Sequence, residues 1–189
     1  MGVLIDWLVE TETSGEMLLV AMPGVGDVGK LAIDAVNSEL DAEPIARLLH
    51  PALPPLAILD DNGLLMPPHI LLSRIDLDGK TVYTLTGNAQ PMSSEGQFEM
   101  ASKILELFSG GEILVLAGMS AGPDRKEIFT ICSSADYRIE LEKMGVDVRR
   151  DEPKAGVIGM AALITAMGPI NNVRASCNIA TTIGNSADP

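Results

Sequence analysis

A glycine-rich segment, PGVGDVGK, is the part of this 189-residue sequence whose residue types and spacing most clearly suggest binding chemistry. Its glycines satisfy the pattern G-x-G-x-x-G between a predicted strand and a predicted helix, which is the context of a dinucleotide site. Glycines there would let backbone amides approach a pyrophosphate, and the helix N-terminus would add its positive dipole. The segment is therefore a candidate anion or nucleotide site, made of Gly24, Gly26, Asp27, Gly29 and Lys30.

Three features of the segment weaken the case for nucleotide binding. Asp27 puts a negative charge at the helix start, where a phosphate would lie. The next predicted strand ends near His50 without an acidic residue to hold a ribose. The pattern G-x-x-x-x-G-K-[ST] of phosphate loops is nearly met, but Leu31 replaces the hydroxyl that would bind magnesium. We expect the glycines to form a tight turn with close helix packing and to bind no nucleotide with useful affinity, with anion or nucleotide binding as the alternative.

Candidate catalytic side chains are few. His50 and His69 each adjoin a proline in a loop-like context, where local hydrogen bonding is the usual role, although either could act as a base. No serine lies in a G-x-S-x-G elbow, and Asp60 and Asp61 are expected to be turn residues. We assign no catalytic residue and favour a noncatalytic protein, with an enzyme as the open alternative.

No metal site or cofactor is indicated. Cys132 and Cys177 form no CxxC motif and have no nearby histidine pair, so we expect buried free thiols. The acidic and basic residues between positions 147 and 152 are typical of a solvated, mixed-charge edge.

The charge balance excludes some classes of partner. Lys and Arg number 13 against 26 Asp and Glu, which gives a formal net charge of −13 and a pI near 4.4. Such a surface repels nucleic-acid phosphates and anionic membranes. The first ten residues lack the basic start of a secretory signal, and glycine, proline and asparagine interrupt the uncharged stretch 155–173. We expect a cytoplasmic protein that binds neither nucleic acid nor membrane.

The elements around the glycine segment form a strand, helix, strand unit. Residues 17–22 are a continuous apolar run typical of a buried strand. From Asp27, which is placed to cap a helix, apolar residues recur at helical spacing. Residues 45–49 form a second predicted strand, which should run parallel to the first.

The remaining segments predict a mixed sheet. Turn residues separate 56–59 from 64–66 and 70–75 from 81–85, which indicates two antiparallel hairpins. Further helices are predicted from a capping box at Ser94, over 136–144 and over 160–167, and further strands over 112–117, 127–132 and 173–179.

This alternation predicts one α/β domain over residues 1–189, with a mixed central sheet and helices on both faces. The helix at 160–167 is apolar all round, so it should lie in the core or at a subunit contact.

Four motifs occur in an order that resembles the proteasome assembly chaperone family, in its archaeal and other prokaryotic members. They are AMPGVGDVGKLAIDAV, TLTGNAQP at 84–91, a glycine turn after a buried strand, and GVIGMAALI from 156. Besides the glycine segment, the family-motif positions are Gly87, Gln90, Pro91, Gly118, Gly122, Gly156 and Gly159. The resemblance implies a fold similar to that of nucleoside phosphorylases.

The resemblance also implies a function: a noncatalytic, homo-oligomeric protein that contacts proteasome α-subunits. A nucleoside-phosphorylase-like enzyme using the segment Gly24–Lys30 is the alternative. Such an enzyme should present an Arg or His cluster for phosphate, and no arginine adjoins the glycine segment.

The C-terminal end departs from the family pattern. Relatives usually continue into a further helix, so the resemblance implies a short or truncated member. Some chaperones of this kind insert a tail with a penultimate tyrosine between α-subunits, whereas this chain ends in Ala187-Asp188-Pro189. We therefore predict that deleting residues 186–189 leaves any association with α-subunits unchanged.

Overall fold

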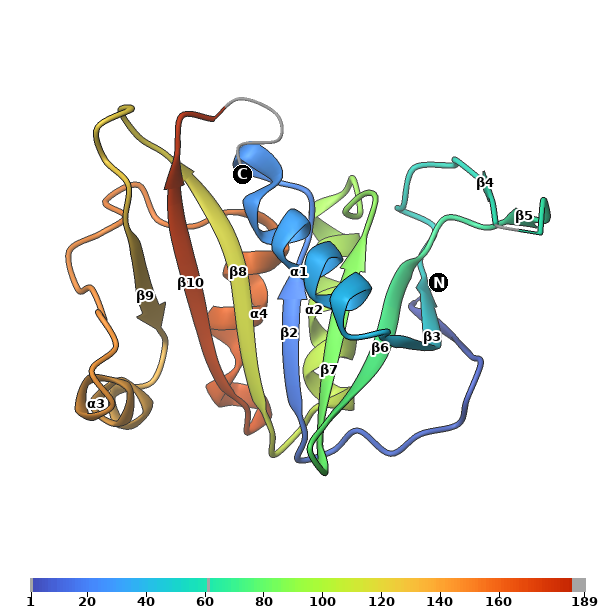
Figure 1. The fold of residues 1–189 in the computed structure, drawn as a ribbon, viewed down its shortest axis with the longest axis horizontal. Coiled ribbons are helices and arrows are strands. Elements are labelled where there is room, and N and C mark those ends of the chain that lie inside the picture. The colour runs from blue at the N-terminus through green and yellow to red at the C-terminus, as the bar shows by residue number, and fades with distance from the viewer. Residues whose placement is uncertain (1, 61, 185–189) are drawn as a thin grey trace.

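The computed structural model describes residues 2–60 and 62–184 of the protein. Its main sheet has eight strands in the order β1-β3-β6-β7-β2-β8-β10-β9 (Figure 1). They are β1 (Leu4–Trp7), β2 (Met17–Ala21), β3 (Glu43–Leu49), β6 (Ile70–Leu77), β7 (Lys80–Gly87), β8 (Glu112–Ser120), β9 (Ile128–Cys132) and β10 (Arg174–Thr182). A separate hairpin pairs β4 (Ile58–Leu59) with β5 (Leu65–Met66). Asp61 and the tail residues 186–189, for which predictions were made above, lie outside the described residues.

The centre of the sheet is parallel and its flanks are antiparallel. Strands β7, β2, β8 and β10 run parallel to one another, whereas β9 and the strands β6, β3 and β1 each pair antiparallel with their neighbours. Both predicted hairpins are present, β4–β5 and β6–β7. The prediction of a mixed sheet is confirmed.

Two features of the sheet differ from the sequence-based expectation or extend it. Strands β2 and β3 point the same way, as predicted, but β7 and β6 lie between them. The crossover rule gives the direction of a returning strand and does not fix how many strands the connection passes. In addition, β1 forms an edge strand that was not predicted, because four residues carry too little periodicity.

Helices cover both faces of the sheet, which confirms that prediction (Figure 1). Helix α1 (Val28–Glu39) packs on β2, β7 and β8 from one side, preceded by a 3₁₀ turn, η1 (Val25–Asp27). On the other side lie α2 (Ser94–Leu107) and α4 (Gly159–Met167), which contact each other. Helix α3 (Ala135–Lys143) lies beside β9, and a turn η2 (Pro169–Asn171) leads into β10. Within the described ranges, no helix is long and apolar enough to cross a membrane.

The main core lies between the sheet and the pair α2 and α4. Its most deeply buried side chains include Leu18, Ile45, Leu72, Leu85, Met100, Ile104, Ile113 and Phe129. Met160 and Ile164 of α4 are fully buried in this same core, and the helix contacts α2, β8 and β10. Of the two interpretations of the apolar helix, the packing supports an ordinary core helix.

Two helix starts differ in detail from prediction. Ser93, one residue before the predicted position, caps α2: its side chain accepts a hydrogen bond from the Gly96 amide at 3.0 Å. Asp27 precedes α1 as expected, but its backbone is left-handed, with φ of 51°, and its side chain does not cap the helix.

Both cysteines are free thiols. Cys177 is buried as expected, and burial raises the pKa of its thiol to about 12. Cys132 is only half-buried, and burial raises its pKa as well.

Candidate functional site

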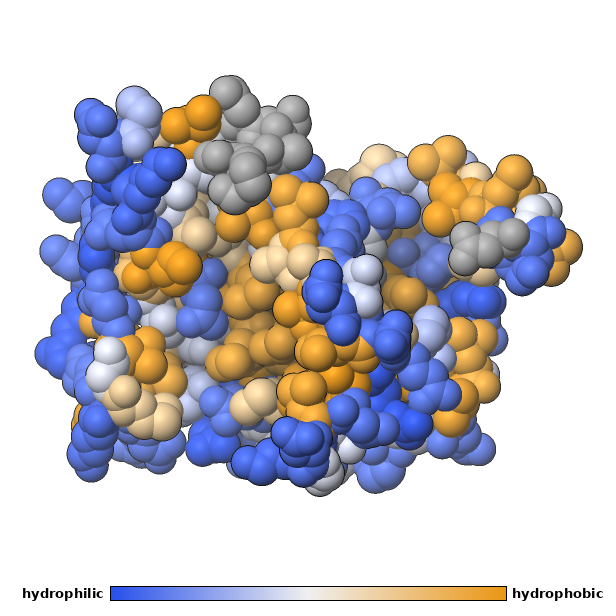
Figure 2. Space-filling view, viewed as in Figure 1, coloured by the Kyte–Doolittle hydropathy of each residue, from blue (hydrophilic) through white to orange (hydrophobic). Residues whose placement is uncertain are grey.

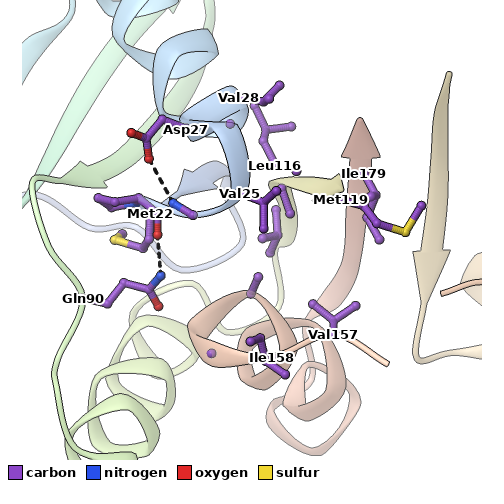
Figure 3. Close-up of a pocket in the computed structure, with 18 of the residues that line it drawn as sticks. Met22, Val25, Asp27, Val28, Gln90, Leu116, Met119, Val157, Ile158 and Ile179 are labelled. Carbon is purple, nitrogen blue, oxygen red and sulfur yellow. Dashed lines mark hydrogen bonds between the residues drawn. The ribbon is translucent and has the colours of Figure 1, made fainter. Parts of the chain in front are cut away.

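A cavity of about 590 Å³ opens at the carboxyl ends of the adjacent parallel strands β2 and β8 (Figure 3). Helices α1 and α4, which contribute their N-terminal ends to its wall, lie on opposite faces of the sheet. Ligands of open α/β sheets bind in such crevices. Of the positions singled out from sequence, seven line the wall: Gly24, Asp27, Gly29, Gln90, Gly118, Gly156 and Gly159. Pro23, which directly precedes the glycine segment, lines it as well.

The glycines of this segment allow close packing between α1 and β8. A Cβ atom on Gly29 would lie 2.3 Å from the Leu116 carbonyl oxygen, and one on Gly118 would lie 2.1 Å from the Val25 carbonyl oxygen. Gly26 is left-handed, with φ of 66°, and is packed against Thr182. Backbone approach and turn geometry therefore account for the G-x-G-x-x-G spacing without a phosphate.

The charged groups of the segment are already occupied. The Asp27 carboxylate accepts a hydrogen bond from the Gly24 amide at 3.1 Å, so it uses a backbone donor that a phosphate would need (Figure 3). Lys30 does not line the cavity and instead forms an ion pair with Asp34, with 2.6 Å between Nζ and Oδ2. Among the described lining residues there is no Lys, Arg or His, so the cavity offers an anion no positive side chain.

Gln90 ties the glycine segment to the start of α4. Its side-chain amide donates to the Pro23 carbonyl at 2.7 Å and accepts from the Met160 amide at 3.3 Å. Gly159 has a left-handed φ of 74°, and a Cβ atom there would approach the Gln90 Oε1 to 3.1 Å. Gln90 therefore joins the motif around position 90 to the glycine segment and to the motif that starts at position 156, and all three lie at the cavity wall.

The other motif positions lie apart from the cavity. Gly87 ends β7 beside the start of β6, where a Cβ atom would meet the His69 carbonyl at 3.2 Å. Pro91 accepts a hydrogen bond from Gln97, and Gly122 lies in an open turn after β8. Gly26 and Lys30 belong to the segment but do not line the cavity.

Most of the remaining wall is apolar, a feature that the motif search missed. Val25, Val28, Met119, Val157 and Ile158, all labelled in Figure 3, line the cavity. Ile158 is 87% exposed although it directly precedes α4. The only sequence signal for this wall was the apolar residue type next to each glycine. Core positions are apolar too, so residue type alone does not distinguish a cavity wall from the core.

The mixed-charge segment near the cavity forms an ion-pair network. Arg125 binds both oxygens of Glu152 and also pairs with Glu127, while Arg149 contacts Glu127 at 2.7 Å and Glu152 at 2.9 Å. The Arg149 guanidinium also lies 4.8 Å from the centre of the Phe129 ring. The network links the loop before β9 to the segment that leads to the cavity wall at Pro153.

The histidines are outside the cavity, and only His69 has the purely local hydrogen bonding that was expected, because His50 is buried and also contacts Glu99 of α2. His50 is 6% exposed in its side chain; its Nδ1 accepts from the Ala52 amide at 3.0 Å, so Nε2 donates to Glu99 at 2.7 Å. His69 donates from Nδ1 to the Pro67 carbonyl at 2.8 Å. Asp60 accepts hydrogen bonds from the turn amides of Asn62 and Leu64. Within the described residues, no three His, Cys, Asp or Glu side chains gather into a group that could hold a metal ion.

Several solved structures share this fold. Pyrococcus furiosus PbaB, described as an archaeal proteasome activator, superposes with a TM-score of 0.82 at 22% identity, covering 99% of this chain and 83% of its own. P. furiosus PbaA, described as an archaeal homolog of proteasome-assembly chaperone, gives 0.78 at 21% identity, with 98% and 79% covered. A Mycobacterium tuberculosis proteasome-assembly chaperone homologue gives 0.65 at 18% identity, with 88% and 75% covered.

Sequence comparison agrees with the fold. An uncharacterized protein of Methanocaldococcus jannaschii is 24% identical over 180 residues, which are 92% of this chain and 68% of that protein. The model of the PAC2 family matches residues 18–189, a range that contains every motif of the cavity wall. The chain belongs to the PAC2 family.

Proposed function

We propose that this protein is a noncatalytic protein that resembles proteasome assembly chaperones in function. It works in the cytoplasm as a homo-oligomer, and it contacts proteasome α-subunits through its folded surface. Family membership supports the proposal, together with the descriptions of the solved relatives as a proteasome activator and as homologues of assembly chaperones. The acidic surface, with a net charge of −13, suits a protein partner with basic patches.

The cavity carries the argument that the protein is noncatalytic. Its motif residues have packing roles: Gly29 and Gly118 admit neighbouring backbone, and Gln90 bridges two loops. An acid–base enzyme needs a titratable side chain placed at its cavity, and the described wall contains only Asp27, whose carboxylate is bound to the Gly24 amide. These contacts support a role of the motif residues in shaping the cavity, and not in catalysis.

Affinity capture from the native extract tests this proposal. The tagged protein is used as bait, and bound proteins are identified by mass spectrometry against a bait of similar charge. We expect proteasome α-subunits among the enriched proteins. Absence of α-subunits, combined with a nucleoside-dependent rise in the melting temperature of the purified protein, would favour the enzyme instead.

Nucleotide or anion binding by the segment Gly24–Lys30 is the second candidate. The position of the cavity at the carboxyl ends of parallel strands, next to the start of α1, favours it. The bound Asp27 carboxylate and the Lys30–Asp34 ion pair oppose it. We predict that calorimetric titration with NAD and with ATP gives no binding heat, and micromolar binding of either would show that this prediction is wrong.

A further inference from the structure

A second pocket, of about 330 Å³, lies beside the edge strand β9. It shares Pro153 and Val157 with the cavity at the strand ends, but its wall also contains Arg138 of α3 and the consecutive residues Arg149 and Arg150. Figure 1 shows α3 and β9 at one end of the sheet. Sites for small molecules begin at about this volume, and this pocket has the positive side chains that the main cavity lacks.

The pocket is built from a stretch of the chain in which the charges balance. Residues 125–154 contain seven Lys and Arg and seven Asp and Glu, so this stretch is neutral, and the rest of the chain carries the whole net charge of −13. Three of the seven arginines of the protein line this one pocket. An anion that is repelled by the chain as a whole therefore meets less opposing charge here.

Arg149 has its acceptors within the chain. Its three side-chain nitrogens donate to Asp147 at 3.1 Å, to Glu152 at 2.9 Å and to Glu127 at 2.7 Å. Three carboxylates therefore surround this one guanidinium. Arg149 forms part of the pocket wall, but it has little positive charge left to offer a ligand.

Arg138 differs from Arg149 in this respect. Its Nε is buried and has no hydrogen-bond partner among the described residues. The contact between this nitrogen and Glu142 Oε1 is 3.8 Å long, which is too long for a hydrogen bond. A buried donor of a charged group is costly without an acceptor, so an acceptor from outside the chain is the natural explanation.

Arg150 competes with Arg138 for the same carboxylate oxygen. Its Nη2 donates to Glu142 Oε1 at 2.6 Å, and its side chain is 63% exposed at the mouth of the pocket. In these ion pairs two guanidinium groups share one carboxylate, which leaves one unit of positive charge. A water molecule could accept a hydrogen bond from Arg138, but only an anion would also offset that charge.

We propose that this pocket binds a small organic acid, whose carboxylate accepts hydrogen bonds from Arg138 and Arg150. The apolar body of the acid lies against Ile131, Val148 and Val157, which also line the pocket. A carboxylate matches the planar fork of a guanidinium and carries the single negative charge that the two arginines require, whereas a phosphate would bring further negative charge close to the acidic residues of the network. The proposed function does not use this site, so either can fail without the other.

An NMR titration of the isotope-labelled full chain tests the proposal, because the Nε–H signal of Arg138 responds to its own acceptor. Isovalerate is the probe, since it joins a carboxylate to a small branched apolar body. Isovaleramide, which has a similar shape without the charge, is its control. We expect isovalerate to shift the Arg138 signal to saturation and isovaleramide to leave it unchanged. Inorganic phosphate should bind more weakly than isovalerate.

Variants distinguish this site from a general effect of charge. Arg138→Gln should weaken isovalerate binding about tenfold or more, read from the backbone amide of Val148, because it removes charge-assisted donors. Glu142→Gln should strengthen binding about threefold or more, since it removes the carboxylate that competes for both arginines. Arg47→Gln is the matched control. Within the described residues Arg47 also has a buried Nε without a partner, but it donates to Asp6 at 3.2 Å and lies near the other end of the sheet.

Circular dichroism and the melting temperature show whether each variant is folded. A wild type whose Arg138 signal does not saturate with isovalerate, or responds equally to isovaleramide, would overturn the proposal. Tighter binding of phosphate would overturn the carboxylate assignment, and an unchanged affinity in the folded Arg138→Gln variant would overturn the site. The capture of α-subunits tests the proposed function separately and is affected by none of these results.

Discussion

Gly29 is the residue at which helix α1 comes closest to the sheet. The Leu116 carbonyl of β8 occupies the space in which a side chain at position 29 would begin. Gly118 plays the reciprocal role toward the Val25 carbonyl, so the two glycines together let the turn η1 and α1 rest on β8. The shape of the cavity therefore depends on the absence of two Cβ atoms.

Gly29→Ala should destabilise the protein although alanine favours helix. The helix-propensity gain is about 1 kcal/mol, whereas a Cβ atom 2.3 Å from a backbone oxygen forces the helix off the sheet. We expect a net loss of about 2 kcal/mol or more in the free energy of unfolding, measured by urea denaturation. Gly122→Ala is the control, because its added Cβ meets open space. Equal stabilities of the two variants would contradict the packing role of Gly29.

At the scale of elements, the ion-pair network connects two segments beside β9, the edge strand that Val148 meets in an isolated bridge. Glu127 directly precedes β9, and Arg149 and Glu152 belong to the segment between α3 and α4. Hydrogen bonds from Arg149 and Arg125 hold the pKa of Glu127 below its ordinary 4.5, and those from Arg125 and Arg149 do the same for Glu152. The network therefore stabilises the loop that supplies Pro153 to the cavity wall.

The lowered pKa values give this network a defined pH dependence. A carboxylate with a lowered folded-state pKa contributes stability above its ordinary value of 4.5, and that contribution disappears as the pH falls through the lowered pKa. The double variant Glu127→Gln, Glu152→Gln should be less stable than the wild type at pH 7, and the difference should shrink toward pH 3. Thermal unfolding across this range measures it, with Glu10→Gln, an exposed glutamate outside the helices and strands, as the control. A difference that stays constant with pH would argue against the network.

The elements themselves were largely predictable from sequence, because each depends on local pattern. Apolar runs predicted β2 and β8, and turn residues such as Asp78-Gly79 predicted the hairpins. Edge strand β1 and the separation of β2 from β3 were missed, since pairing between distant strands leaves no local signal. For the cavity, the resemblance supplied Gln90 and Gly159, but only the fold shows that they meet.

At the scale of the whole molecule, two surfaces have different characters. The cavity at the strand ends is built by backbone contacts and lined mainly by apolar residues, while the β4–β5 hairpin stands apart from the sheet and carries exposed leucines. The remaining surface mixes charged and apolar side chains: Figure 2 shows further hydrophobic surface over the middle of the face that it draws, and the chain as a whole carries a net charge of −13. The net charge of −13 suits the proposed contact with a partner protein that carries basic patches.

The most direct measurement uses biolayer interferometry. It records the binding of the purified full-length protein to purified proteasome α-subunits from the same source at several salt concentrations. The proposed function predicts saturable binding that weakens as salt rises, because an acidic body would meet a basic face. It also predicts the same affinity after NAD or ATP is added. No saturable binding at any salt concentration, in a sample that is folded by circular dichroism, would contradict the proposal.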